Sequence, residues 1–237
     1  MSLGTHGDVQ PFVALGTALA RRGAQVTVAT GAGFDTMIEA AGLTSAPFSI
    51  NYQDLLKQPD IQAAMHTLSG KIRIWRQSKE WLRQELQEQW DRARAIIIIG
   101  LDLIVYNLKT ALAPHIAHDL RAVAGPALMQ PVFVPTGAFP FMMLSSRSLG
   151  PFVNRLSHRL STGLAHALNR RIFRALAASR ADFRLASGLD ELAGYAPNGR
   201  PVPRLHAYSR HLVPKPDDWP DTETITGYWF RNNGEPD

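Results

Sequence analysis

The chain opens with LGTHGDVQPF at residues 3–12, the stretch that decides its fold. Gly4 and Gly7 can adopt positive φ and let another molecule approach the backbone closely. Asp8 is a good helix N-cap, apolar residues recur behind it at helical spacing, and Gly23 is a suitable helix end. The stretch predicts a strand-loop-helix-strand unit with the Asp8 carboxylate at the turn, where α/β enzymes keep their chemistry.

Strand-like and helical segments alternate along the rest of the chain, which predicts a parallel sheet covered by helices on both faces. We therefore expect an α/β fold with a doubly wound, mostly parallel, Rossmann-like sheet. The expected strands are 26–30, 45–49, 103–106, 127–129, 183–186 and 205–208, and the expected helices are 34–41, 72–95, 113–121 and 154–178.

Composition narrows the class of protein. The 237 residues are 45% hydrophobic and 19% charged, which is ordinary for a globular protein with a well-formed core. The chain has no cysteine, which excludes disulfides and thiolate metal sites. No apolar run approaches the roughly 20 residues of a membrane span, and the N-terminus lacks a basic-then-apolar leader. We expect a cytoplasmic protein.

Positive charge is concentrated in the middle of the chain. The net charge is +5, and residues 120–181 contain no carboxylate. Such a block is either a solvated helix face or an attractor of phosphates, anionic lipid or nucleic acid. No nucleic-acid-binding module accompanies it, so we expect no nucleic acid partner.

A row of apolar residues repeats every four positions within this basic block, at Leu156, Leu160, Leu164, Leu168, Ile172 and Leu176. A four-residue row drifts around a 3.6-residue helix, so we expect a break near 161–163 that gives two helices. The row is interpreted as a core stripe, with membrane or lipid-like ligand contact as the alternative. On that alternative, residues 147–180 make a peripheral contact with the inner face of the membrane.

The amino-acid composition changes after Tyr208, where prolines and acidic residues indicate an extended connector that ends with TGYWF at 226–230. We expect one domain over 1–212 and an inter-domain linker over 213–237. Residues 1–3 are too short for a central first strand, so both ends look cut.

Four blocks, in this order, resemble bacterial and fungal sterol glucosyltransferases and the antibiotic glycosyltransferases related to them. They are GTHGDVQPFVAL at 4–15; DLIVYN at 102–107 with HIA at 115–117; QP, PT and FP at 130–131, 135–136 and 139–140; and VPKPDDWP at 213–220 with TGYWF at 226–230. The resemblance implies the N-terminal, acceptor-binding domain of a GT-B glycosyltransferase. The family's C-terminal domain, which binds the nucleotide sugar, has no counterpart here.

The resemblance also implies inverting transfer, in which an acceptor hydroxyl attacks the anomeric carbon of a UDP-sugar, with glucose the expected sugar. Asp8 is the expected base, because a hydroxyl is a poor nucleophile until its proton is withdrawn. Related plant enzymes carry a histidine in the equivalent turn with an orienting carboxylate one strand away, where this chain has Asn107. From the residues alone, Asp8 could equally be a helix cap. Gly4, Thr5, His6 and Gly7 are expected to form the loop near the donor diphosphate.

The acceptor site is expected to hold a lipophilic alcohol such as a sterol or a polyketide, because apolar side chains follow the acceptor-loop motif. Ordinary core packing is the alternative for each of them. The expected acceptor-binding residues are Trp75, Asn107, Gln130, Pro131, Phe133, Thr136, Phe139, Phe141 and Met142. No metal and no cofactor are expected beyond the UDP-sugar co-substrate, and exposed interface surface favours a homodimer.

Two other functions remain open from the sequence. One is a non-catalytic module that binds an acceptor or a membrane, and the other is one subunit of a split transferase. A dinucleotide-dependent oxidoreductase is disfavoured, because the first loop lacks a G-x-G-x-x-G pattern.

Overall fold

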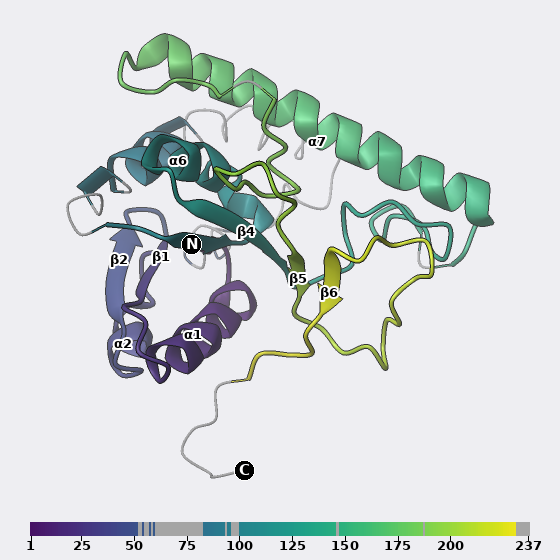
Figure 1. Ribbon diagram of the computed structural model, residues 1–237, viewed down its shortest axis with the longest axis horizontal. Helices are drawn as coiled ribbons and strands as arrows, with labels where there is room; N and C mark the ends of the chain where they lie inside the picture. The colour runs from purple at the N-terminus through teal and green to yellow at the C-terminus, as the bar shows by residue number, and fades with distance from the viewer. Residues whose placement is uncertain are drawn as a thin grey trace. The chain divides into compact units, whose positions relative to one another are not determined.

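The computed structural model describes residues 1–51, 54, 57, 59, 83–92, 94–95, 100–145, 147–186 and 188–230 (Figure 1). The chain divides into two compact units. Unit 1 comprises Met1–Gly100 together with Phe230, and unit 2 comprises Leu101–Trp229. Each unit carries its own parallel strands, and the two are described separately.

Unit 1 contains helix α1 (His6–Ala20), strand β1 (Thr27–Gly31), helix α2 (Asp35–Glu39) and strand β2 (Thr44–Phe48). β1 and β2 pair in parallel, with Thr27 opposite Thr44. Ser2 forms a parallel bridge with Thr30, and its backbone N–H donates to the Ala29 carbonyl oxygen at 2.9 Å. The chain therefore enters α1 from the carboxyl end of a strand-like segment that lies beside β1.

α1 packs closely on β1 because Gly16 lies at the contact. A Cβ added to Gly16 would come within 2.9 Å of the Leu43 side chain and 3.1 Å of Val26, so a larger residue would require these side chains to shift. Around this contact α1 buries Val9 and Val13 in a core shared with β1, α2 and the start of β2. Burial of this apolar face stabilises α1 more than its intrinsic helix propensity does.

Unit 2 contains the four parallel strands β3 (Leu103–Tyr106), β4 (Val123–Leu128), β5 (Arg204–His206) and β6 (Glu223–Ile225), hydrogen-bonded in that order. The 3-10 turn η2 (Leu108–Thr110) and helix α6 (Ala113–Leu120) connect β3 to β4, and α6 packs against both strands. Helix α7 (Pro151–Ser179) lies between β4 and β5 in the sequence and is the longest helix in Figure 1.

Charged side chains join the last two strands inside unit 2. Glu223 on β6 pairs with Arg204 and His206 on β5, and its carboxylate oxygen lies 2.7 Å from the His206 Nε2. The His206 ring stacks on Trp219 at 4.6 Å between centroids, and Trp219 belongs to an apolar cluster with Leu128 and Tyr208. Both oxygens of the buried Glu223 carboxylate have a partner on β5, so these contacts fix β6 to the sheet despite its length of three residues.

The α/β class with parallel strands is confirmed, but several predicted elements are corrected. Residues 183–186 form no strand, and a strand at Glu223–Ile225 was not predicted. α7 runs unbroken through 161–163, so the predicted break is wrong. α1 ends at Ala20, three residues before Gly23.

The predicted helix at 72–95 lies partly outside the described residues, and its described part at 83–92 is helical. Trp75 lies outside the described residues. None of the described helices is long and apolar enough to cross a bilayer. The expected division into a domain over 1–212 and a linker over 213–237 stays a prediction.

Candidate functional site

Each unit contains its own group of candidate residues, and the group in unit 1 lies at the start of α1. Gly4 has a φ of 137°, a backbone conformation that side chains other than glycine rarely adopt. Thr5 follows in extended conformation as the N-cap of α1. The turn brings the first helical turn to the carboxyl end of the strand-like segment at Ser2, the edge where open α/β sheets bind ligands.

Asp8 lies in the first turn of α1 at the third helical position, not at the N-cap that the sequence predicted. The Thr5 backbone N–H donates to the Asp8 Oδ2 at 2.9 Å, and the Thr5 hydroxyl lies 3.3 Å from the same oxygen. The Ser2 hydroxyl donates to the Asp8 backbone carbonyl at 2.7 Å. These contacts form a capping box, which holds the half-buried carboxylate in one place at the positive end of the helix dipole.

His6 and Gly7 belong to the helix, although both were predicted to lie in the loop. His6 is exposed, and its ring centroid lies 6.3 Å from that of Phe34. Gly7 is exposed, and no heavy atom lies within 4 Å of the position that a Cβ would take. Among the described residues, none covers the Gly7 side of the helix start, so another molecule can approach it there.

The group in unit 2 begins at the carboxyl ends of two neighbouring strands. Asn107 follows β3 and is 5% exposed, and the Thr110 hydroxyl donates to its backbone carbonyl at 2.8 Å. Gln130 follows β4 by two residues and is exposed. Because β3 and β4 are parallel neighbours, both residues lie at the same edge of the sheet.

The loop after β4 carries most of the predicted acceptor residues, and the structure separates them into two groups. The rings of Phe133 and Phe141 approach each other at 5.6 Å between centroids, and Met142 beside them is 45% exposed. Phe139 instead packs on Trp219 in the interior of unit 2, with centroids 6.3 Å apart. Pro131 is half-buried.

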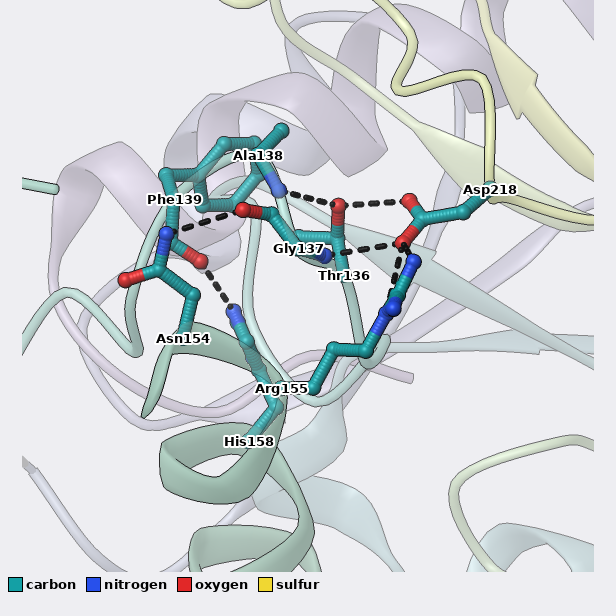
Figure 2. A network of polar contacts seen from close by, with 8 residues as sticks. All are labelled: Thr136, Gly137, Ala138, Phe139, Asn154, Arg155, His158 and Asp218. Carbon is teal, nitrogen blue, oxygen red and sulfur yellow. Dashed lines mark hydrogen bonds and ion pairs between the residues drawn. The ribbon is translucent and has the colours of Figure 1, made fainter. Parts of the chain in front are cut away.

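Thr136 faces inward as well, because its hydroxyl is bound to Asp218 (Figure 2). The Asp218 carboxylate accepts hydrogen bonds from the Thr136 hydroxyl at 2.7 Å, the Gly137 N–H at 2.8 Å and the Arg155 guanidinium at 2.9 and 3.1 Å. Partial burial alone would raise the pKa of Asp218, but these donors lower it below its usual value. A single ionised carboxylate therefore joins the loop, α7 and the segment before β6.

The first two turns of α7 hold the other side of the same loop. The Asn154 side-chain amide donates to the Gly137 carbonyl at 2.9 Å, and the Phe141 N–H donates to the Ser157 hydroxyl at 2.8 Å. His158 Nε2 lies 3.1 Å from the Phe139 carbonyl oxygen, and burial lowers the pKa of this imidazole, which favours its neutral form. Polar contacts thus fix the loop at Thr136, Gly137, Phe139 and Phe141.

Sequence reasoning did not identify these anchoring residues. Asp218 lies in a segment expected to be a linker, and Asn154, Arg155 and His158 lie in a helix considered for its leucines and its charge. Their spacing carries no signal, because the contacts that hold the loop join residues 16 to 82 positions apart, with the shortest separation at Ser157 and the longest at Asp218.

Two histidine–carboxylate clusters lie in unit 2 outside this loop. Glu191 lies 3.3 Å from His115 Nε2 and 3.4 Å from His166 Nδ1, and Glu223 pairs with His206. Across the residues that the structure describes, no three His, Cys, Asp or Glu side chains are grouped as a metal site.

The chain is similar to known glycosyltransferases in sequence and in fold. Residues 1–100 match the glycosyltransferase family 28 N-terminal domain. The chain is 28% identical over 242 residues to the O-mycaminosyltylonolide 6-deoxyallosyltransferase of Streptomyces fradiae, covering 97% of this chain and 53% of that protein. It is 26% identical to the sterol 3-beta-glucosyltransferase of Leptosphaeria maculans, covering 99% of this chain but 15% of that protein.

Solved structures show the same fold. The glycosyltransferase of kitacinnamycin superposes with a TM-score of 0.58 at 15% identity, covering all of this chain and 52% of that one. The calicheamicin glycosyltransferase superposes with a TM-score of 0.53 at 16% identity, covering 96% of this chain and 50% of that one. The fold is that of the N-terminal domain of a GT-B glycosyltransferase, and the chain spans about half the length of these structures and less of the sterol relatives.

Proposed function

We propose, from the glycosyltransferase family 28 N-terminal domain that residues 1–100 carry, that this chain is the acceptor-binding half of an inverting glycosyltransferase. The observation that carries the proposal is the Asp8 carboxylate, held by a capping box in the first turn of α1 with open surface beside it. A fixed carboxylate at the carboxyl edge of a parallel sheet suits a general base.

The proposed reaction has one bond-forming and one bond-breaking event at the same carbon. The acceptor oxygen attacks the anomeric carbon of the sugar, and the bond from that carbon to the nucleoside diphosphate breaks. The Asp8 carboxylate takes the hydroxyl proton as the oxygen attacks, so the acceptor leaves as a neutral glycoside. The diphosphate leaves with the bonding electron pair on the side of the sugar opposite to the attack, which inverts the anomeric centre.

The proposed acceptor is a lipophilic alcohol such as a sterol. Exposed or half-buried apolar side chains in the loop after β4 support this class, among them Phe133, Phe141 and Met142. Asn107 and Gln130 are polar groups at the same strand edge that can orient a hydroxyl. Thr136 and Phe139 face inward, so in our account they shape the loop.

The proposed donor is a UDP-sugar, with glucose as the sugar. Gly4, Thr5, His6 and Gly7 are proposed to lie near its diphosphate, because the exposed helix N-terminus favours negative charge. The chain spans 53% of the deoxyallosyltransferase that it resembles, so we expect a second half to supply most donor contacts. On this account the 237 residues bind an acceptor without turning over the donor alone.

A split transferase, with the donor-binding half on a separate polypeptide, fits the same observations. A non-catalytic acceptor-binding module is the second candidate, and the capping box favours it, because the Thr5 contacts give Asp8 a structural role.

The test is sugar transfer from UDP-glucose to a panel of sterols and macrolactones. It compares the 237-residue chain with the chain joined to a donor-binding half, and acceptor binding to the chain alone is measured by calorimetry. We expect acceptor binding by the chain and transfer only by the joined protein. Transfer by the 237 residues alone would contradict the proposal that a second half is needed to bind the donor. Acceptor binding without transfer in the joined protein would favour the non-catalytic binding module.

A further inference from the structure

Helix α7 has its polar and apolar faces reversed over its first five turns. The side that faces the body of unit 2 carries the buried polar residues Asn154, Ser157 and His158. The polar contacts that hold the loop after β4 occupy this side (Figure 2). The Asn154 amide, the Ser157 hydroxyl and the His158 Nε2 therefore have partners within unit 2.

The outward side of the same turns is apolar. Leu160 is 65% exposed and Leu164 is 72% exposed, so the prediction of a core stripe is wrong for this part of the leucine row. At 3.6 residues per turn the apolar positions fall within about 160° of the helix circumference. Those that are exposed on α7 are Phe152, Val153, Leu156, Leu160, Leu164 and Leu168.

Further exposed apolar side chains precede α7 in the sequence. Met143 is 84% exposed and Leu144 is 62% exposed in the segment before the helix, and Leu149 is 45% exposed. Folded proteins rarely expose so many large apolar side chains on one side of a helix, so the outward side of α7 is expected to have an occupant.

Arginines take over the outward side where the leucines end. Arg170, Arg171 and Arg174 are exposed in the last third of α7, and their positions on the helix fall within the same arc as the leucines. Arg159 is exposed at the edge of the apolar face. No carboxylate occurs from residue 120 to 181, so the helix itself adds no negative charge to this apolar and cationic face.

We propose that the outward face of α7 binds the surface of an anionic lipid bilayer, with the helix axis lying in the plane of the membrane. The apolar side chains would enter the boundary between headgroups and acyl chains, and the arginines would contact lipid phosphates. The helix does not meet the requirements for crossing a bilayer. The inference rests on α7 alone and holds whether or not Asp8 is a catalytic base.

Pairing with a second copy of α7 fits the charges less well. Parallel pairing would place the arginine cluster against itself, and antiparallel pairing would place it on the leucines of the partner copy. Both arrangements bury cations without an opposite charge, because α7 carries no acidic residue. A bilayer with anionic headgroups accommodates the leucines and the arginines together.

The experiment is co-sedimentation of the 237-residue chain with phosphatidylcholine vesicles, with and without phosphatidylglycerol. We expect binding to the phosphatidylglycerol vesicles that weakens as salt is raised, because the cationic contribution is screened. Replacing Leu160 and Leu164 together with glutamine is expected to lower the partition coefficient at least about tenfold. Arg170→Gln with Arg171→Gln is expected to remove the preference for phosphatidylglycerol.

Leu212→Gln is the matched control, since Leu212 is 71% exposed in unit 2 but lies outside α7. This variant is expected to bind vesicles like the parent, and circular dichroism checks that every variant keeps its helix content. Equal binding by the parent and the Leu160/Leu164 variant would overturn the proposal. So would no vesicle binding by the parent, or a dimer in sedimentation equilibrium that the same variant dissociates.

Discussion

At the scale of single residues, Asp8 caps α1, and the same contacts suit the role of base that we propose for it. As the third residue of α1 it accepts from Thr5 and caps the helix, and as a fixed carboxylate it suits proton abstraction. The sequence placed this carboxylate at the helix start but assigned it to the wrong position in the cap. A capping box depends on the extended conformation of Thr5, which the local sequence favours but does not dictate.

Asp218 is the residue whose removal should most disturb the loop after β4. Asp218→Ala removes the hydrogen-bond acceptor for Thr136, Gly137 and Arg155. We therefore expect it to lower the free energy of unfolding of unit 2 by about 1–2 kcal/mol. The figure lies low in the range for ionic hydrogen bonds because the side chain is 28% exposed. Urea unfolding measures the loss, and hydrogen exchange locates it at 136–141.

Asp217→Ala provides the control for this prediction. Asp217 is the exposed neighbour of Asp218, and its removal changes the net charge by the same amount. Equal effects of the two variants on unfolding and exchange would show that charge, and not the network, is responsible.

At the scale of elements, the sequence predicted the buried strands and failed where tertiary contacts decide. The strands at β1, β2 and β3 are apolar runs between helical segments, and they were found within one or two residues. β6 was missed because only three residues pair, and their partner Arg204 lies 19 positions away from Glu223. Residues 183–186 resemble a strand in composition but have no neighbouring strand to pair with in the described part of unit 2.

The prediction of a break in α7 was wrong because it assumed that the leucine row must stay buried. Leu156 to Leu168 point outward, whereas Phe173 and Leu176 are buried near the end of the helix, so the row drifts across the surface of one continuous helix. Ser161 remains compatible with the helix by donating its hydroxyl to the Ser157 carbonyl at 2.7 Å.

Gly163 lies in the interior of this unbroken helix and offers a direct test of it. No heavy atom lies within 4 Å of an added Cβ, and the position has helical backbone. Gly163→Ala is expected to raise the free energy of unfolding by about 0.5–1 kcal/mol, because alanine loses less backbone entropy than glycine. Chemical denaturation of the variant and the parent measures the difference.

Gly188→Ala is the control, since this glycine also has open space around it but a φ of +78°. Alanine is strained there, so the substitution is expected to destabilise the protein. If Gly163→Ala also destabilises, α7 is not continuous at this position in solution.

At the scale of the whole molecule, the α/β class and the parallel pairing followed from the alternation of segments alone. The two compact units did not, because a boundary near residue 100 depends on which long-range contacts form. The family model matches the same 1–100 stretch that forms most of unit 1.

Two buried glutamates give the units opposite responses to pH. Burial raises the pKa of Glu85 in unit 1 to about 7, although the Gln89 side chain opposes the shift. Its contribution to stability is therefore greatest below the unfolded pKa of about 4.3 and declines as the pH rises through about 7. Burial would also raise the pKa of Glu223 in unit 2, but His206 and Arg204 lower it. Its contribution is present above about 4.3 and is lost as the pH falls through the folded pKa.

Glu85→Gln is accordingly expected to be more stable than the parent at about pH 8 and to lose most of this advantage by about pH 5. Glutamine keeps the hydrogen-bond acceptor for Gln89 without the charge. Urea midpoints at the two pH values measure the effect. A constant difference between variant and parent would show that Glu85 does not titrate in this range.

The central claim is that Asp8 acts as the base of a sugar transfer, and the most direct test is the turnover number of Asp8→Asn in the chain joined to a donor-binding half. Asparagine keeps an acceptor for the Thr5 N–H, so α1 should remain capped. Asp35→Asn is the control, because Asp35 lies in the first turn of α2 and its carboxylate accepts a hydrogen bond from the Ser45 hydroxyl. We predict that Asp8→Asn lowers kcat by at least about a hundredfold with an unchanged unfolding midpoint, while Asp35→Asn keeps full activity. Full activity of Asp8→Asn would contradict the account and leave Asp8 as a helix cap.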